Sequence, residues 1–402
     1  MNSEEAKALE RSYLLNLYPP IRMPMVMGRG EGARLWDTEG GEYLDFISGG
    51  RAVTGVGHCH PRVVQAIRDQ AGRLLHVSND FHTEPQLRLA ERLSNLFGGR
   101  CFFCNSGAEA VEAAIKLARK HGYQTGGPEK HHIVGALKSF HGRTFGALAA
   151  TGQSQYHEGF QPLPAGFAHV PFNDVAGLQR AVNRHTCAVL LEPILGESGV
   201  YPATPEYLEA AREVCRANGA VLIFDEVQTG LGRTGKLFAY QHYDVEPDII
   251  TLAKGLGGGV PIGAMLAREP PSSAFAPGDH ASTFGGSPLA AAAALAVLDA
   301  IQEEGLVEKA ARIGALLAQG LATIRQKSQL VSDIRARGLM IAVDLTQPVA
   351  PRVKAECVAR GLLIITVGDQ MLRLLPPMVL TEVEAERGIE ILAQVLTEME
   401  PG

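Results

Sequence analysis

Apolar runs that alternate with helical patterns most constrain the fold of this 402-residue chain. Such runs lie at residues 132–137, 188–194, 220–224, 248–252 and 262–267. A strand that is apolar on both faces is typical of a parallel sheet covered by helices on each side. The chain is therefore predicted to be an α/β protein with a mostly parallel, doubly wound sheet.

The two ends of the chain are predicted to form a smaller unit. Residues 33–37 and 42–46 flank a turn and are predicted to form a hairpin. The alanine-rich segment 290–304 is predicted to be a long helix that leads to further strands at residues 340–345, 362–366 and 371–375. The expected units are an N-terminal segment that joins the small domain, a large domain and a C-terminal small domain, at residues 1–50, 51–305 and 306–402.

Lys254 lies between an apolar strand and a glycine-rich segment. The run at residues 248–253 leads into Lys254, and four glycines follow within residues 255–261. Such a lysine can be desolvated and still be free to move, which suits an amine that forms a Schiff base with a carbonyl cofactor. Most lysines at strand ends are simply solvated, so that alternative stays open for Lys254 taken alone.

Asp225 follows the apolar strand at residues 220–224. Ligands of open α/β sheets bind at the carboxyl ends of strands, and an aspartate there can pair with the ring nitrogen of pyridoxal phosphate. Asp225 and Lys254 together are interpreted as a cofactor clamp. An acidic strand end beside a lysine can also be purely structural.

Residues 105–109, Asn-Ser-Gly-Ala-Glu, precede a run of strong helix formers at residues 110–119. Ser106, Gly107 and Ala108 are therefore predicted to lie at a helix N-terminus. Free N–H groups and the positive end of the helix dipole favour an anion such as phosphate at that place. The alternative is a plain serine N-cap, which Asp225 and Lys254 make the weaker interpretation.

Two other sequence patterns are interpreted as structural features and not as binding sites. Residues 230–235 match the letters of the dinucleotide fingerprint, but the helical segment that follows, at residues 236–243, is too short. Residues 101–104 form a Cys-x-x-Cys pattern with an apolar interior, which favours two buried thiols over a redox or zinc site. No metal site is predicted, and six cysteines suit a reducing compartment.

Charge and composition restrict the partners of the chain. A net charge of −6 gives no basic footprint for nucleic acid or for an anionic membrane. No window approaches the roughly 18 consecutive apolar residues of a membrane span, and the acidic N-terminus shows no targeting peptide. A cytoplasmic metabolic enzyme with no nucleic-acid or membrane partner is expected.

Six segments, taken together, carry a family resemblance. They lie at residues 105–109, 139–144, 191–200, 225–235, 252–259 and 282–286. In order and spacing they resemble the class III aminotransferases that depend on pyridoxal 5'-phosphate (PLP), over nearly the whole chain. Within that class the chain is most similar to enzymes that act on N2-acetylornithine. The resemblance implies PLP fold type I and a homodimer with shared active sites.

The resemblance implies roles for the residues around the cofactor. Lys254 is expected to bind PLP and to act as general base with a lowered pKa, and Asp225 to pair with the pyridinium nitrogen. Phe140 and Val227 are expected on the two faces of the ring, and Gln228 near the phenolic oxygen. The alternative for Phe140 is an ordinary core position.

The cofactor phosphate is expected at Ser106, Gly107 and Ala108. By resemblance, the hydroxyl of Thr283 reaches the phosphate bound by the partner subunit. The sequence by itself shows no contact between subunits.

Three charged residues are expected to select the substrates. Arg143 resembles the arginine that binds a substrate carboxylate through its planar guanidinium. Arg373 and Glu197 resemble a switch in which the glutamate covers the arginine while an ω-amino donor is bound and releases it for 2-oxoglutarate. The alternative for either arginine is an ordinary surface ion pair.

The chain departs from the family pattern at positions that bear on the donor. Arg51 stands where related enzymes carry an aliphatic residue, and it can border the substrate pocket or point into solvent. Ser198 replaces a glycine beside the switch glutamate, and Ala108 replaces a common threonine. These changes leave the chemistry intact and affect only the choice of donor.

The expected reaction moves the δ-amino group of N2-acetylornithine to 2-oxoglutarate, giving glutamate, in a ping-pong cycle of arginine biosynthesis. Ornithine, succinylornithine and 4-aminobutyrate are alternative donors. A PLP-dependent aminomutase or decarboxylase is possible on the same scaffold. A non-catalytic binding scaffold has little support, because the expected active-site residues are all present.

Overall fold

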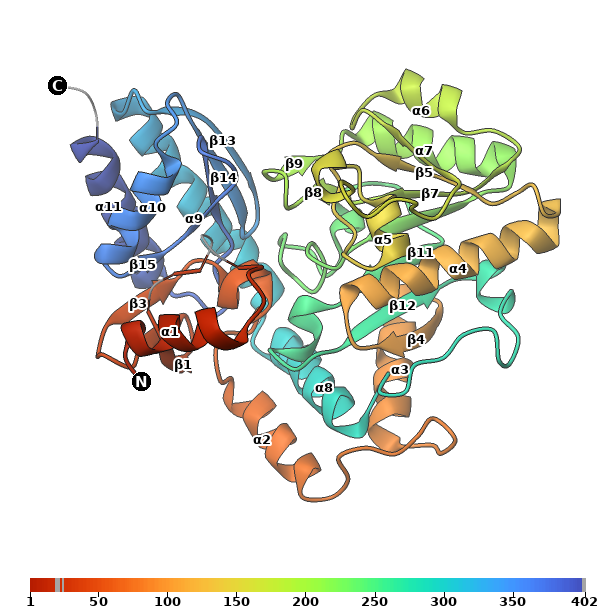
Figure 1. Cartoon of the computed structure of the whole chain (residues 1–402), viewed down its shortest axis with the longest axis horizontal. Coiled ribbons are helices and arrows are strands. Elements are labelled where there is room, and N and C mark those ends of the chain that lie inside the picture. The colour runs from red at the N-terminus through yellow and green to blue at the C-terminus, as the bar shows by residue number, and fades with distance from the viewer. Residues whose placement is uncertain (19–21, 24, 400–402) are drawn as a thin grey trace.

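The computed structural model describes residues 1–18, 22–23 and 25–399. Residues 19–21, 24 and 400–402, which fall in the predicted terminal units, lie outside the described residues. Figure 1 shows a large α/β part and a smaller part in which the N-terminal strands lie beside the C-terminal helices. Among the described residues, no helix is both long and apolar enough to span a membrane.

A seven-stranded sheet forms the centre of the large part. Its order is β4-β12-β11-β10-β7-β5-β6, and β12 is antiparallel to both of its neighbours while the other pairs are parallel. The predicted α/β class with a mostly parallel sheet is confirmed. The strands are β4 (Arg100–Cys104), β5 (His132–Ala136), β6 (Phe167–Val170), β7 (Thr186–Leu191), β10 (Val221–Asp225), β11 (Ile249–Leu252) and β12 (Gly263–Ala267).

Helices cover both faces of this sheet, which explains the unbroken apolar runs. Along β10, Val221 and Ile223 pack into the core under α4 (Gly107–Gly126), whereas Leu222 and Phe224 pack into the core on the opposite face. Side chains alternate between the faces of a strand, so each position of β10 needs an apolar residue. Every residue of β7, β10, β11 and β12 is buried as a result.

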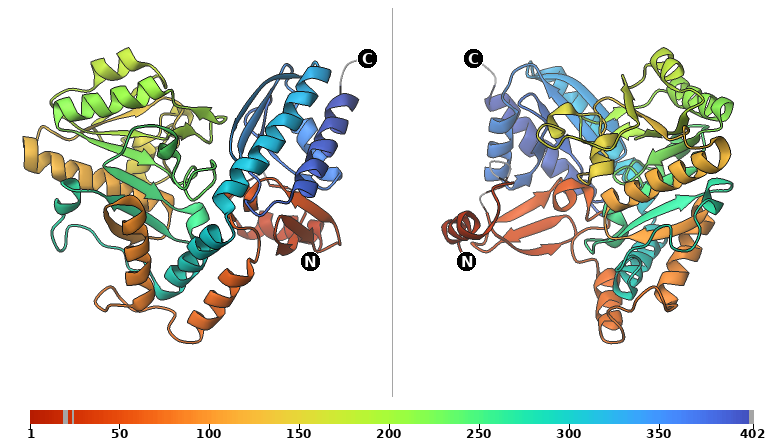
Figure 2. Two further views of the ribbon diagram at one scale, coloured as in Figure 1. Left: turned by 180° about the vertical axis from the view of Figure 1, so that it is seen from behind. Right: turned by 45° about the vertical axis from the view of Figure 1, so that its right-hand side comes forward.

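Among the remaining helices of the large part, α3 (Glu84–Phe97) and α7 (Pro205–Asn218) contribute buried residues to the same core as Leu222 and Phe224. Figure 2 shows α8 followed directly by the first helix of the smaller part. The predicted helix at residues 290–304 corresponds to α8. These helices are α2 (Pro61–Ala71), α3 (Glu84–Phe97), α5 (Phe145–Ala150), α6 (Val175–Ala181), α7 (Pro205–Asn218) and α8 (Pro288–Glu303).

The smaller part joins both ends of the chain through one parallel pair of strands. Leu44 of β3 pairs with Leu362 of β15 in the sheet β1-β2-β3-β15, and a second sheet has the order β13-β14-β17-β16. The bounds are α1 (Ser3–Tyr13), β1 (Met27–Glu31), β2 (Arg34–Asp37), β3 (Glu42–Asp45), α9 (Leu306–Lys327), β13 (Val331–Arg337), β14 (Met340–Leu345), α10 (Ala350–Ala359), β15 (Leu362–Leu363), β16 (Ile365–Thr366), β17 (Met371–Leu374) and α11 (Glu382–Glu398).

Candidate active site

A cavity of about 340 Å³ opens beside the carboxyl end of β10. Its volume lies in the range of pockets that hold small ligands and cofactors. A larger cavity of about 750 Å³ lies beside α1, and none of the predicted site residues lines it. Nine predicted site residues line the smaller cavity: Ser106, Gly107, Ala108, Phe140, Glu197, Asp225, Val227, Gln228 and Lys254.

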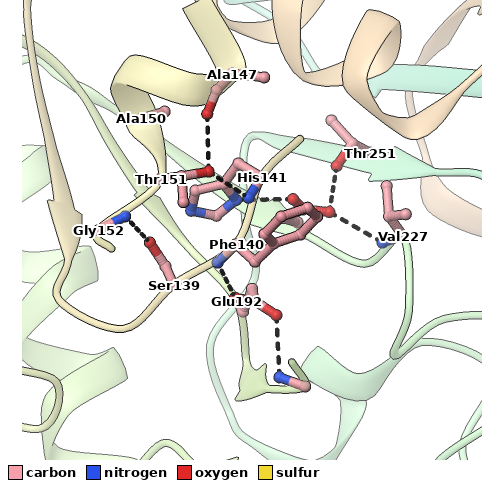
Figure 3. Close-up of polar contacts among 12 residues, drawn as sticks. Ser139, Phe140, His141, Ala147, Ala150, Thr151, Gly152, Glu192, Val227 and Thr251 are labelled. Carbon is pink, nitrogen blue, oxygen red and sulfur yellow. Dashed lines mark hydrogen bonds and ion pairs between the residues drawn. The ribbon is translucent and has the colours of Figure 1, made fainter. Parts of the chain in front are cut away.

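The carboxylate of Asp225 has three donors at the end of β10, and Figure 3 labels the residues that provide them, His141, Val227 and Thr251. Its Oδ1 accepts from the Val227 backbone N–H at 3.0 Å and from the Thr251 hydroxyl at 2.9 Å. Its Oδ2 lies 2.8 Å from Nδ1 of His141. Hydrogen bonds of this kind fix the orientation of a buried carboxylate.

His141 was given no role from the sequence, although this residue lies within one of the family motifs. Its ring is buried, and Nε2 has no hydrogen-bond partner among the described residues. The His141 backbone N–H donates to the Thr151 hydroxyl at 2.9 Å, which holds the ring beside Asp225. No local pattern could indicate this contact, because 84 residues separate the two members of the pair.

Lys254 lies in the lining of the cavity, after β11, in a left-handed backbone conformation with φ of 43°. Burial lowers the pKa of its ammonium group, while the nearby Glu197 carboxylate acts in the opposite direction. A lowered pKa makes a neutral, nucleophilic amine more accessible near neutral pH. This agrees with the lowered pKa expected from the sequence.

The N-terminus of α4 borders the same cavity. The Ser106 hydroxyl accepts from the Glu109 backbone N–H at 3.2 Å, so Ser106 is the N-cap of α4. The first N–H groups of a helix have no partner within the helix. Here the start of the helix borders the cavity, because Ser106, Gly107 and Ala108 line it. A Cβ atom on Gly107 would lie 2.7 Å from Val227 Cγ1, so only glycine fits this approach.

Phe140 lies at the cavity wall, and Arg143 lies outside the lining. The Phe140 backbone N–H donates to Glu192 Oε1 at 2.8 Å, and the Gly196 N–H donates to the other oxygen of Glu192 at 3.1 Å. The exposed Arg143 guanidinium lies 3.9 Å from the centre of the Tyr156 ring and 5.4 Å from that of Phe140. Arg143 is thus held by cation–π contacts at the rim.

Glu192 is buried beneath Phe140. Burial raises the pKa of its carboxyl to about 7, although the two backbone N–H donors act in the opposite direction. Its bonds join the Phe140 loop to the segment that carries Glu197. Glu192 therefore supports two parts of the cavity wall at once.

Glu197 is shared by two arginines and a glutamine. Its Oε2 accepts from Arg373 Nη2 at 3.1 Å and from Arg51 Nη1, and its Oε1 accepts from Gln228 Nε2 at 2.9 Å. Burial raises the pKa of the Glu197 carboxyl, but Arg373, Lys254 and Arg51 together outweigh burial and lower that pKa to about 2. The predicted contact between Arg373 and Glu197 is present, and Arg51 turns toward the site.

Thr283 is the one predicted residue that lies away from this cluster. It is exposed in the loop before α8 and neither lines the cavity nor contacts the residues described above. This placement agrees with a role in a neighbouring subunit, which stays a prediction.

The residues that line the cavity could bind the phosphate, the ring nitrogen and the aldehyde of PLP. The N-terminus of α4 offers N–H donors for a phosphate, and the hydrogen-bonded carboxylate of Asp225 offers an acceptor for a protonated ring nitrogen. Lys254 provides an amine within the same cavity. The missing side chain at Gly107 keeps the space beside Val227 open.

Comparisons with known proteins agree with this site. The family model "Aminotransferase class-III" matches residues 19–396. The acetylornithine aminotransferase of Caldanaerobacter subterraneus is 50% identical over 97% of this chain and 98% of its own length.

Solved structures give the same result. The crystal structure of acetylornithine aminotransferase from Elizabethkingia anophelis has a TM-score of 0.89 and 35% identity, and the match covers 99% of this chain and 100% of that one. The ornithine aminotransferase from Toxoplasma gondii has a TM-score of 0.94 and 34% identity, with 99% and 96% covered. Together with the family model, which spans most of the sequence, these matches show that the chain belongs to the class III aminotransferases, enzymes that use PLP to move an amino group between an amino donor and a keto acid.

Proposed function

We propose that this enzyme transfers the δ-amino group of N2-acetylornithine to 2-oxoglutarate. The observation that carries this proposal is the position of Glu197, which covers Arg373 in the cavity that Lys254 lines. A covered arginine leaves a pocket that accepts an uncharged tail next to the reacting amine. The 50% identity to an acetylornithine aminotransferase supports the same donor.

Each group of residues around the cavity would have a separate role in the reaction. PLP, when bound, supplies an electron sink that makes the donor carbon acidic. The N-terminus of α4 would bind its phosphate, and Asp225 would hold its ring nitrogen protonated, oriented by His141 and Thr251. Lys254 Nζ would carry the proton from the donor carbon to the cofactor, and in the second half-reaction it would carry a proton from the cofactor to the acceptor carbon. Phe140 and Val227 would keep water from the ring.

The substrate carboxylates would be bound at the rim. Arg143 is exposed and free of ion pairs among the described residues, so its guanidinium is available to a carboxylate of either substrate. Arg373 would bind the second carboxylate of 2-oxoglutarate after Glu197 moves away. One pocket would thereby accept a monocarboxylate donor and a dicarboxylate acceptor in turn.

The active enzyme is proposed to be a homodimer. Thr283 is exposed, and the neighbouring Phe284 is 58% exposed, so this loop offers polar and apolar surface that a second copy of the chain can cover. A second copy of the chain that covers this loop would bring Thr283 to the phosphate end of the other cavity. The site of one subunit is then incomplete without its partner.

The test is a measurement of products with N2-acetylornithine and 2-oxoglutarate. Glutamate should form in equal amount to the donor consumed, and no glutamate should form when 2-oxoglutarate is omitted. Release of CO2 from the donor would instead indicate a decarboxylase. Isomerisation of the donor without a keto acid would indicate an aminomutase.

A further inference from the structure

Arg51 lies in an unusual turn, Ser48–Ala52, at the start of the large part. Four of its five residues have positive φ angles: 46° at Ser48, 70° at Gly49, 121° at Gly50 and 63° at Ala52. Two of the four are not glycine, and such conformations cost free energy unless surrounding contacts impose them. The backbone around Arg51 is therefore held in place by its neighbours.

Buried polar groups fix this turn from both sides. Asp45 accepts from the Ile47 N–H at 2.8 Å and from the Gly49 N–H at 2.7 Å. The Ser48 hydroxyl donates to the Leu375 carbonyl at 2.5 Å and accepts from the buried Arg233 guanidinium at 3.1 Å. Hydrogen bonds thus hold the backbone on both sides of Arg51, while the Arg51 side chain remains 49% exposed.

Arg51 and Arg373 bind the same oxygen of Glu197, but their guanidinium groups differ in how far they can move. Arg373 is fully buried, and its Nη1 donates to the Gly196 carbonyl at 2.6 Å, so its guanidinium cannot follow a moving partner. Arg51 is half exposed and its guanidinium has room to move with Glu197. Glu197 thus lies between one fixed and one movable cation.

We propose that Arg51 is a positioning residue that retains Glu197 when this carboxylate leaves Arg373, and so favours binding of the dicarboxylate acceptor. The inference rests on the proposed function, in which Glu197 must uncover Arg373 for 2-oxoglutarate. It adds a partner for the displaced carboxylate, at a position where related enzymes are expected to have no charge.

The physical reason is the charge of the displaced glutamate. When a dicarboxylate occupies Arg373, Glu197 and the ligand bring two negative groups close together, and each repels the other. A cation that moves with Glu197 compensates this repulsion and lowers the cost of the displacement.

The experiment measures equilibrium binding to the PLP-loaded enzyme by calorimetry with two unreactive ligands. Glutarate carries two carboxylates, and N-acetylnorvaline carries one carboxylate and lacks the donor amine. The variants are Arg51→Ile, Arg51→Lys, Glu197→Gln and the double variant Arg51→Ile/Glu197→Gln. The control is Arg62→Ile, because Arg62 also pairs with a glutamate and is 48% exposed but lies on α2, away from the cavity lining.

The expected result is a selective loss of glutarate affinity. Arg51→Ile should weaken glutarate binding by about three- to fivefold, the size of one half-exposed ion pair, and change N-acetylnorvaline binding by less than about twofold. Arg51→Lys should recover most of the loss, and Arg62→Ile should match the wild type. An unchanged glutarate affinity in Arg51→Ile, or an equal loss for both ligands, would overturn the inference.

The double variant separates an indirect effect from direct contact. When Glu197→Gln replaces the carboxylate by a neutral amide, there is no charge to retain, so Arg51→Ile should lose its effect on glutarate in that background. A loss that persists would mean that Arg51 binds the ligand itself, and the inference would be wrong. Glu197→Gln alone should strengthen glutarate binding, and an unchanged affinity would refute the switch of the proposed function rather than the role of Arg51.

Discussion

His141 and Asp225 form a buried pair in which Nδ1 of the histidine lies 2.8 Å from Oδ2 of the carboxylate. The far nitrogen of the ring, Nε2, is buried and has no partner among the described residues. The histidine therefore has one polar contact through its ring, and that contact orients Asp225. In the proposed function, this pair determines how firmly the ring nitrogen of the cofactor is held.

Replacing His141 with phenylalanine should impair the cofactor site and leave the fold intact. Loss of a hydrogen bond to a charged group costs about 1.5 to 3 kcal/mol, so kcat/KM should fall by roughly 10- to 150-fold. His169→Asn is the control, since His169 is partly buried nearby and, among the described residues, its ring bonds only the Ala150 carbonyl. Equal activities of the two variants would show that His141 does not support Asp225.

Lys254→Ala should abolish amino transfer while the protein still binds PLP. Loss of a general acid–base group alone costs about 10²- to 10⁴-fold, and loss of the covalent attachment adds to it. Steady-state rates and bound cofactor are measured together, with the exposed Lys236→Ala as control. A small primary amine added to the solution should restore part of the rate. Substantial unassisted turnover by Lys254→Ala would exclude the assigned role.

Gly107→Ala should weaken PLP binding because its Cβ would lie 2.7 Å from Val227 Cγ1. Overpacking of this kind costs about 1 to 3 kcal/mol, so the dissociation constant of PLP should rise by roughly 5- to 150-fold. The double variant Gly107→Ala/Val227→Ala removes the clash and should recover much of the affinity. If the second substitution gives no recovery, the clash does not explain the loss.

The contributions of Glu192 and Glu226 to the free energy of unfolding should be lost as the pH rises from about 4.5 to about 7. Burial raises the pKa of Glu192 and of Glu226 from 4.5 to about 7. The folded protein then keeps protons that the unfolded chain has released, so stability is lost across this window. Glu192→Gln cannot ionise, so in urea titrations at several pH values the stability of the variant relative to the wild type should rise across this window. An identical slope in the variant would show that Glu192 does not hold its proton.

Subunit mixing tests whether Thr283 acts in the partner's site. Thr283→Glu places a negative charge opposite the phosphate, and this variant and Lys254→Ala should each have little activity alone. Mixed dimers would contain one site with both native residues, so random exchange should restore about a quarter of the wild-type activity. Mixing Lys254→Ala with Asp225→Asn should restore none, because both residues act within their own subunit. Absence of recovery in the first mixture would place Thr283 outside the shared site.

Much of the fold could be predicted because the spacing of apolar residues along the sequence reflects which side chains are buried. The unbroken apolar runs of β7, β10, β11 and β12 reflect helices on both faces, and these strands were predicted within a few residues. β13 was missed, because its sequence, Val-Ser-Asp-Ile-Arg-Ala-Arg, is mostly polar and only its first residue is buried. Its pairing with β14 defines it, and that pairing is a tertiary property.

The site residues that lie in local motifs could be predicted from the sequence. The contacts between residues far apart in the sequence could not. Lys254, Asp225 and the α4 N-terminus follow from strand ends and a helix start, which are local features. The contacts of His141 with Asp225 and of Arg51 with Glu197 join segments 84 and 146 residues apart. No local pattern fixes such distances, so the orientation of Arg51 stayed open until its side chain was seen beside Glu197.

N2-acetylornithine is the proposed amino donor, and a half-reaction tests this assignment most directly. The PLP-loaded enzyme is mixed separately with N2-acetylornithine, ornithine, succinylornithine and 4-aminobutyrate, and the absorbance of the bound cofactor is followed without any keto acid. N2-acetylornithine should convert the cofactor fastest by at least tenfold, equivalent to about 1.4 kcal/mol of transition-state preference. Faster conversion by any of the other three donors would contradict the assignment.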